Sequence, residues 1–230
     1  MIANLPVASA GDSLHISIGV HEDSSVTITE TIRIESGNDW FTNEFDRHLP
    51  TARRKRFGLR HSKGFQLLEC FRDGKPETCK VFGDKGLMIR IGDFMNRAAV
   101  PQIRTYTLKY RLDNQMISTG EGNRFSWTVT EKYWGWWPIN VSASVNLPGD
   151  ASAHLKDNRI LIGPEGKEET IRIGGVVSND GIVHFVAPRS LGQSEVFSIS
   201  LMWPKGYAGV TIKRGCFSCH SGGSRNPGFE

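Results

Sequence analysis

The stretch WTVTEKYWGWWPINVSASVNLP, Trp127–Pro148, decides the fold prediction for this chain. Four of the six tryptophans lie within its first eleven residues, and a strand-like run that ends at Leu147 follows them at once. Large aromatic side chains beside an extended segment concentrate apolar mass where a β-rich core would form. The stretch therefore predicts an architecture, and it carries no signature of a particular chemistry.

Alternation of apolar and polar residues recurs along most of the chain. Residues 16–20 and 26–34 alternate on either side of a short turn, which predicts an opening hairpin. The same period of two is clear at 104–112 and returns at 197–203, and residues 179–181 (Asn-Asp-Gly) are typical of a tight hairpin turn. No window shows a convincing amphipathic helix. The sequence predicts an all-β protein, an antiparallel β-sandwich.

Chain length bears on the number of sandwiches. One antiparallel sandwich usually takes about 100 residues, so 230 residues are expected to form two tandem lobes, with a single larger sandwich as the alternative. The junction is expected near Trp137–Asn140, because Pro138 cannot donate to a central ladder. The expected organisation is a signal-peptide remnant (1–10), a first lobe (11–137), a second lobe (138–206) and a flexible C-terminal tail (207–230).

Composition and charge limit the function classes. The net charge of +4 comes partly from a basic run at 53–63, which favours anionic lipid headgroups or plain solvation over nucleic acid, since an exported β-domain rarely meets nucleic acid. Export is suggested by Ala8–Ala10, an A-x-A pattern of the kind that signal peptidase cuts, although an ordinary flexible N-terminus is the alternative. No segment has the run of about 18 apolar residues that a membrane-spanning helix needs.

Six ordered segments resemble one protein family. They are VTITETIRI (26–34), FDRHLP (45–50), MIRIGD (88–93), RTYTLKYRL (104–112), FSWTVTEKYWGWWPI (125–139) and LMWPKG (201–206). Their order and spacing resemble the N-terminal extracytoplasmic region of predicted membrane proteins, domain of unknown function 2207. The resemblance implies a signal peptide, an exported β-domain and then transmembrane helices, with no activity to carry over. The chain departs from that pattern after Gly206, so membrane association is expected through segments absent from this chain.

Two cysteines are candidates for a disulfide. Cys70 and Cys79 flank a segment in which Asp73 and Gly74 supply a turn, so the thiols are expected opposite each other on a hairpin. In an oxidising compartment they should bond, whereas free buried thiols in a cytosolic protein are the alternative.

Glu30 is the residue that conflicts with the pattern around it. It lies in the same alternating register as the apolar residues of 26–34, which directs a carboxylate into the core. A bare charge there is costly, so a partner is expected, and Arg47 is predicted because a guanidinium satisfies both carboxylate oxygens. A general acid with a raised pKa is the functional alternative.

The C-terminal tail contains Cys216, Cys219 and His220 in a C-x-x-C-H arrangement. This is the attachment signature of c-type haem, in which two thiols bind the porphyrin and the imidazole ligates the iron. Only ten residues follow His220, so a haem pocket would have to come from the preceding β-domain, where Met202 is the nearest thioether. A disordered tail is the alternative, given its Gly, Ser and Pro content.

The clustered tryptophans permit two interpretations. Trp134, Trp136 and Trp137 could form an exposed platform for sugar rings or for a lipid interface. Core packing is the competing interpretation, because large aromatic residues in sandwich strands are usually buried.

No motif for a nucleophile, a zinc site or a phosphate loop is present in the sequence. The chain is therefore expected to be a non-catalytic extracytoplasmic module of a bacterial envelope protein, without a cofactor, that binds another protein or an envelope component. Electron transfer through a covalent haem c is the alternative.

Overall fold

The computed structural model describes residues 11–35, 44–49, 64–83, 87–92, 103–130, 140–164, 167–171, 174–192 and 194–207. Within these ranges nearly every element is a strand, and the one helical element is a short 3-10 turn at Ala151–His154. The predicted all-β class is therefore confirmed.

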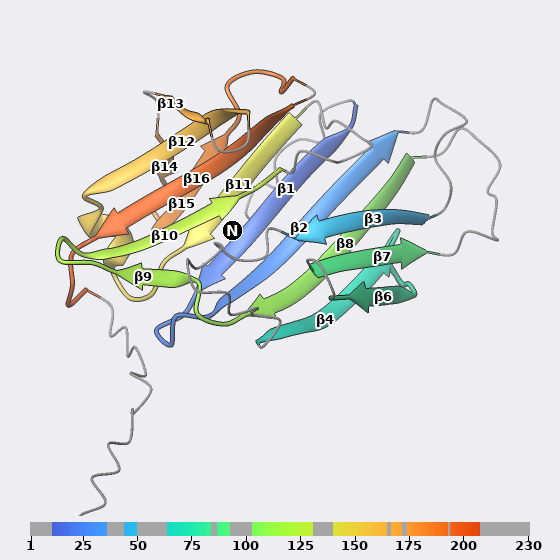
Figure 1. The fold of residues 1–230 in the computed structure, drawn as a ribbon, viewed down its shortest axis with the longest axis horizontal. Coiled ribbons are helices and arrows are strands. Elements are labelled where there is room, and N and C mark those ends of the chain that lie inside the picture. The colour runs from blue at the N-terminus through green and yellow to red at the C-terminus, as the bar shows by residue number, and fades with distance from the viewer. Residues whose placement is uncertain are drawn as a thin grey trace, which may run out of the picture.

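An eight-stranded sheet forms the base of the molecule (Figure 1). Its strand order is β14 (Val176–Val177), β15 (Ile182–Val186), β11 (Asn140–Asn146), β1 (Ser13–Val20), β2 (Val26–Glu35), β8 (Ile103–Leu112), β4 (Phe65–Arg72) and β5 (Lys75–Pro76). Every pairing is antiparallel except that of β1 with β11, which is parallel. The opening hairpin predicted from the first alternating segments is the β1–β2 pair.

Two smaller sheets cover one face of this base (Figure 1). The five-stranded sheet has the order β13 (Glu169–Ile171), β12 (Asp157–Pro164), β16 (Glu195–Trp203), β10 (Asn123–Thr128) and β9 (Met116–Ser118). The three-stranded sheet has the order β3 (Glu44–Leu49), β7 (Leu87–Gly92) and β6 (Cys79–Phe82). The result is a sandwich with one continuous layer and one divided layer.

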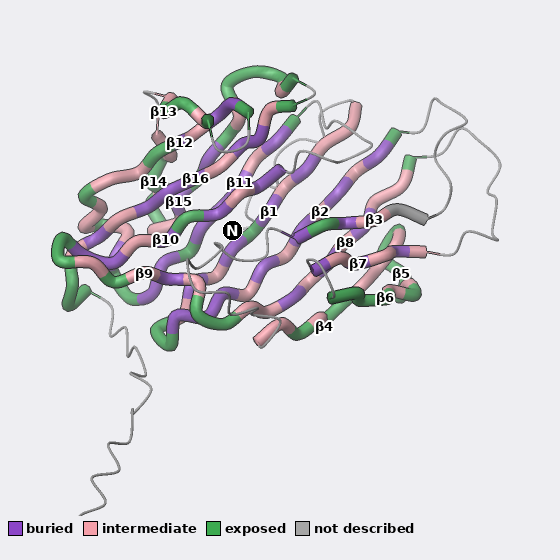
Figure 2. The backbone as a smooth tube through the Cα atoms, viewed as in Figure 1, coloured by how far each residue is buried: buried purple, intermediate pink, exposed green. Residues whose placement is uncertain are grey.

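Apolar side chains fill the space between the two layers. Buried and less buried residues alternate along β1 and β2, as Figure 2 shows, because successive side chains of a strand point to opposite faces. Ile28 of β2, Tyr106 of β8 and Phe197 of β16 are all almost completely buried. Truncating a buried Ile or Leu to Ala usually costs about 2–5 kcal/mol, so this interlayer core is the main source of stability.

The strand pairing does not follow the expected division into two tandem lobes at residue 137. β11, from the range expected to form the second lobe, pairs with β1 of the first along Ser13↔Asn140 to Gly19↔Asn146. β16 likewise pairs with β10 across the expected boundary. Both of these sheets therefore contain strands from either side of residue 137. The period of two in a sequence identifies strands, but it does not specify their partners, and here the partners are distant in the chain.

Two predicted turns are present. Asp73 and Gly74 have φ values of 52° and 74° between β4 and β5, the left-handed conformation that tight hairpin turns require. Gly181 has a φ of 80° and donates its N–H to the carbonyl of Ser178 in the turn between β14 and β15.

Candidate functional site

A charged pair lies in the centre of the sandwich. The side chains of Glu30 on β2 and Arg47 on β3 are both 0% exposed. Arg47 Nε donates to Glu30 Oε2 at 2.6 Å, and Arg47 Nη2 donates to Glu30 Oε1 at 2.9 Å. The guanidinium therefore binds the carboxylate through two parallel hydrogen bonds, the geometry in which Arg satisfies both oxygens. This is the pair that the sequence predicted.

Tyr110 completes the cluster. Its hydroxyl donates to Glu30 Oε1 at 2.6 Å from β8, the strand next to β2. Tyr110 was not predicted as a partner of Glu30, although the sequence holds a signal for it. The alternation along 104–112 directs its side chain inward, and a buried tyrosine hydroxyl usually needs a partner. Glu30 thus accepts three hydrogen bonds, which fix the position of its carboxylate.

Arg47 also connects the Glu30 cluster, meaning Glu30, Arg47 and Tyr110, to backbone carbonyls. Its Nη1 donates to the carbonyl of His48 at 2.7 Å, and its Nη2 donates at 3.4 Å to the carbonyl of Val129, directly after β10. The cluster therefore contacts all three sheets: the large sheet through Glu30 and Tyr110, the three-stranded sheet through Arg47, and the end of β10 in the five-stranded sheet.

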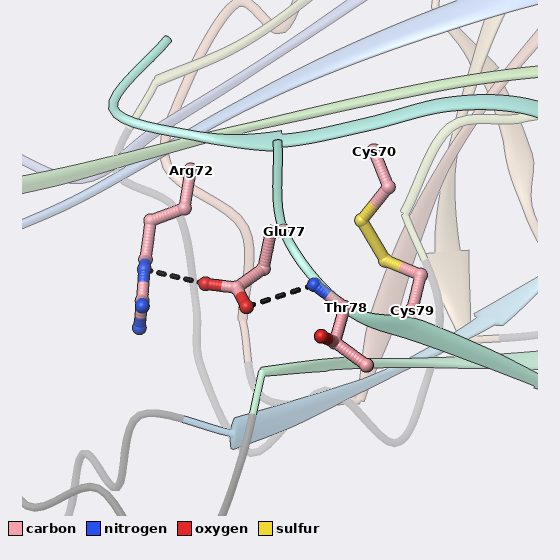
Figure 3. Close-up of a disulfide and its surroundings, with 5 residues drawn as sticks. All are labelled: Cys70, Arg72, Glu77, Thr78 and Cys79. Atoms are coloured by element: carbon pink, nitrogen blue, oxygen red, sulfur yellow. Dashed lines mark hydrogen bonds and ion pairs between the residues drawn. A yellow bond between two sulfur atoms is a disulfide. The ribbon is translucent and has the colours of Figure 1, made fainter. Parts of the chain in front are cut away.

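A disulfide joins Cys70 and Cys79 (Figure 3), with Cα atoms 6.4 Å apart. The bond is confirmed, but its place differs from the expectation. Cys70 lies on β4 of the large sheet, whereas Cys79 begins β6 of the three-stranded sheet. The hairpin arm β5 ends at Pro76, so the bond links two sheets and not two arms of one hairpin.

The segment that carries Cys79 from one sheet to the other is fixed by Glu77. Its carboxylate pairs with Arg72 at 2.7 Å and accepts the N–H of Thr78 at 2.8 Å, as Figure 3 shows. The N–H of Glu77 donates to the carbonyl of Cys70 at 3.0 Å. These contacts hold the crossover beside the disulfide.

The outer face of the large sheet, turned away from the smaller sheets, is rich in hydroxyl groups. On β1 and β11, the ring of His15 contacts the Ser142 hydroxyl at 2.8 Å through Nδ1 and the Ser144 hydroxyl at 3.3 Å through Nε2. Burial lowers the pKa of His15, and the neighbouring His184 lowers it further. His15 is therefore favoured as neutral imidazole, with both nitrogens used by serines.

Charged residues toward one side of this outer face form cross-strand pairs. Lys109 on β8 pairs with Glu69 on β4 at 2.8 Å. Arg111 pairs with Asp23 at 2.6 Å. The Ser25 hydroxyl and N–H are the main causes that lower the pKa of Asp23, and Arg111 adds to the effect. Such pairs leave the face polar with little unbalanced charge.

Several predicted sites lie outside the described residues, so they stay predictions. They are the haem motif Cys216, Cys219 and His220, the platform Trp134, Trp136 and Trp137, and the basic run at 53–63. Two other tryptophans are placed: Trp127 and Trp203 are buried between the sheets. A covalent Soret-absorbing product after expression with a cytochrome maturation system would establish the haem hypothesis.

Within the described residues, no group of three or more His, Cys, Asp or Glu is placed to hold a metal ion. No helix in the described part of the chain is long and apolar enough to cross a membrane.

Comparison with known proteins gives a family match. The model of the N-terminal domain of a predicted membrane protein, DUF2207, matches residues 12–211. The uncharacterized protein YciQ of Escherichia coli strain K12 is 25% identical over 203 residues, which cover 87% of this chain and 31% of that protein. The chain therefore spans less than a third of this relative.

Similarity to solved structures is weak. Native yeast LTA4 hydrolase aligns with a TM-score of 0.49 and 11% identity, over 82% of this chain and 28% of that one. The M1 zinc metallopeptidase of Deinococcus radiodurans aligns with a TM-score of 0.43 and 8% identity, over 82% and 41%. These likenesses are too distant to bear on the activity of this chain.

Proposed function

We propose that this chain, which belongs to the DUF2207 family of predicted membrane proteins and matches the N-terminal domain of that family, is a non-catalytic extracytoplasmic module. In this proposal the module binds another protein or a component of the cell envelope. The proposal places this domain on the outer side of a bacterial cell membrane, with the rest of the membrane protein supplying the anchor.

The Cys70–Cys79 disulfide is the observation that best supports an extracytoplasmic location. Disulfides persist in oxidising compartments and are rare in the cytosol. This one links two sheets, so the fold gains stability wherever the bond forms. An extracytoplasmic domain can rely on such a bond, whereas a cytosolic one would fold with it reduced.

The non-catalytic assignment is supported by what the buried polar groups do. Glu30 is the carboxylate that a sequence pattern would suggest as a general acid, but its two bonds with Arg47 join two sheets and its bond with Tyr110 joins two strands of the large sheet. His15 is similarly occupied by two serines. These contacts favour a structural role for both residues.

The binding role is supported by the surface. One face of the large sheet is left uncovered by the described strands, and apolar side chains remain exposed at its β14–β15 margin, where Val176 and Val186 are 69% and 64% exposed. Exposed apolar groups beside polar ones are typical of surfaces that meet partners.

The location can be tested through the state of the cysteines in cells. In a variant with Cys216→Ser and Cys219→Ser, only Cys70 and Cys79 remain of the four cysteines in this chain, and the same variant with Cys70→Ser and Cys79→Ser gives the background from any other cysteine. The full protein is expressed in its own host, thiols are trapped with acid, and a maleimide of high mass counts free thiols on a denaturing gel. We expect no mass shift until a reductant is added. Two reactive thiols without reductant would contradict an extracytoplasmic location.

The binding role can be tested with a photo-crosslinking residue placed at Thr29 on the outer face of β2 in cells. We expect a discrete adduct from Thr29, which is half-buried, and none from Thr170, an exposed threonine on β13 of the five-stranded sheet. Equal labelling at the two positions, or no adduct from Thr29, would contradict binding through the outer face.

A further inference from the structure

Among the described strands, β6 lies at the edge of the three-stranded sheet and pairs with β7 alone. The other edge strand, β3, has Arg47 and Leu49 buried against the rest of the molecule. On β6, by contrast, Val81 and Phe82 are each 42% exposed, and Lys80 is exposed as well. An exposed edge strand presents unpaired backbone groups and is a template for pairing with another strand.

The hydrogen-bond pattern shows which backbone groups point outward. The N–H of Gly92 donates to the carbonyl of Thr78 at 3.0 Å, in register with the β6–β7 pairs. Since bonding alternates along an antiparallel pair, Lys80 and Phe82 direct their backbone groups toward β7, while Val81 directs its N–H and C=O away. No hydrogen bond to these groups of Val81 occurs among the described residues.

Lys80 and Phe82 of β6 place a cation and an aromatic ring on the outer face of the three-stranded sheet. Arg90 of β7 lies over the ring of Phe82, with its Cζ 5.4 Å from the centroid, so the ring already accepts a cation. Asp46 holds Arg90 through hydrogen bonds of 2.8 and 2.9 Å. Lys80 points to the same face as Phe82 and has no ion pair within the described part of the chain.

We propose that this protein pairs with a second copy of itself through β6, antiparallel and with the two-fold axis at Val81. In this register the N–H and C=O of Val81 bond to the same groups of Val81 in the second copy. Lys80 then lies opposite Phe82 of the second copy, and Phe82 opposite Lys80. Each Lys80 meets an aromatic ring across the two-fold axis, and no like charges lie directly opposite each other across that axis, which is favourable for cross-strand pairs.

The other sheet edges are less suited to such pairing. β14 has only two residues, and β5 has two with Pro76 as the second, which are known ways to block an edge. β13 and β9 have three residues each. β6 combines a longer open edge with an exposed aromatic residue.

The predicted dimer is weak. A four-residue edge buries less than the area of about 1,200 Å² below which interfaces are usually transient. In a membrane, tethering two copies to one surface raises their effective concentration and offsets this weakness. The inference concerns self-association alone, and it stands whether or not the proposed binding role holds.

Sedimentation equilibrium of the full chain, from micromolar to millimolar concentration, tests the pairing. We expect a reversible monomer–dimer equilibrium. Val81→Pro removes the outward N–H without removing a β6–β7 bond, and the loss of the two central hydrogen bonds should weaken the dimer by about tenfold or more. Lys80→Glu should weaken it too, because it replaces a cation over an aromatic ring with an anion.

Val177→Pro is the matched control. Val177 is also 42% exposed and also lies on an edge strand, and its backbone groups point outward because Ser178 bonds to Ile182. This variant should dimerise like the parent. A strictly monomeric parent, or a dimer that both proline variants weaken equally, would overturn the proposal.

Hydrogen exchange on the unmodified chain tests the β6 pairing independently. The amide of Val81 should exchange rapidly at low concentration and become protected as the concentration rises, while the amide of Val177 stays unprotected. An exchange rate at Val81 that does not depend on concentration would also overturn the proposal.

Discussion

The two small sheets rest on the same face of the large sheet, but they are held there in different ways. The five-stranded sheet contributes large buried side chains to the core, among them Phe125, Trp127, Phe197, Ile199, Leu201 and Trp203. The three-stranded sheet contributes the smaller set Leu49, Leu87, Ile89 and Ile91, together with Arg47. The three-stranded sheet is also joined covalently to β4 of the large sheet by the Cys70–Cys79 disulfide. A small sheet with little apolar area is thus fastened by a buried ion pair and a covalent link.

The strongest way to break this arrangement is to remove Arg47. Arg47→Met leaves Glu30 buried without its cation, and breaking a buried pair on one side usually costs about 3–5 kcal/mol. We expect a loss of this size in the free energy of unfolding, measured with denaturant. Arg90→Met, which removes the partly exposed pair with Asp46, is the control and should cost less than about 1 kcal/mol.

A second variant distinguishes the loss of the pair from the loss of packing. In Glu30→Leu with Arg47→Met, no buried charge is left unpaired, so part of the stability lost in the single variant should return, although the Tyr110 hydroxyl loses its bond to Glu30. If the single variant is no more costly than Arg90→Met, the pair does not fasten the sheet.

Removing the disulfide should have the next largest effect. Cys70→Ser with Cys79→Ser opens a loop with a sequence separation of 9, for which the chain-entropy model gives about 2–3 kcal/mol. Thermal unfolding of oxidised parent and variant measures the difference. Cys216→Ser with Cys219→Ser is the control and should leave the unfolding temperature unchanged. Equal stability of parent and variant would show that the crossover contacts of Glu77 suffice.

Tyr110→Phe should have a smaller effect. It removes one hydrogen bond to a charged group, which usually contributes about 1.5–3 kcal/mol, while Arg47 still binds both oxygens of Glu30. We therefore expect a loss near the lower end of that range. A loss as large as that of Arg47→Met would mean that the hydroxyl, and not the guanidinium, is the main partner of Glu30.

The smallest expected effect is the stability that one surface ion pair on each small sheet loses at low pH. Hydrogen bonding to Arg90 is the main cause that lowers the pKa of Asp46 on the three-stranded sheet. Hydrogen bonding to Arg189 lowers the pKa of Glu195 on the five-stranded sheet to about 2. A carboxylate whose pKa is lower in the folded state stabilises the protein above its unfolded pKa, and this contribution disappears as the pH falls through the folded value.

The contribution of Glu195 should therefore fade between the unfolded value of 4.5 and about 2, and that of Asp46 below 3.8. Asp46→Asn and Glu195→Gln should each flatten the fall of stability in that window and leave stability above pH 5 little changed, because exposed pairs contribute modestly. A variant with the same acid dependence as the parent would show that its pair does not contribute.

The sequence predicted those features that depend on local periods. Alternation placed Ile28 and Tyr106 in the core and directed Glu30 inward, which required a partner such as Arg47. It did not predict the parallel β1–β11 pair or the separate three-stranded sheet, because partners distant in the chain leave no mark on local periodicity. The position of Cys79 was mistaken for the same reason: a hairpin turn at Asp73 and Gly74 does not reveal that the chain crosses to another sheet.

The contacts of His15 with Ser142 and Ser144 also could not be predicted from the sequence. They depend on the register of β1 against β11, which places Ser142 opposite His15 across 127 residues of chain. Only the parallel pairing brings these side chains together.

Hydrogen exchange of the two small sheets tests most directly whether they are fastened differently. In the variant with Cys70→Ser, Cys79→Ser and Arg47→Met, amides of β7 should exchange much faster than in the parent. Amides of β10 and β16 should stay protected under the same native conditions, because their aromatic core is intact. Equal acceleration in both small sheets, or protection of β7 unchanged from the parent, would contradict the account.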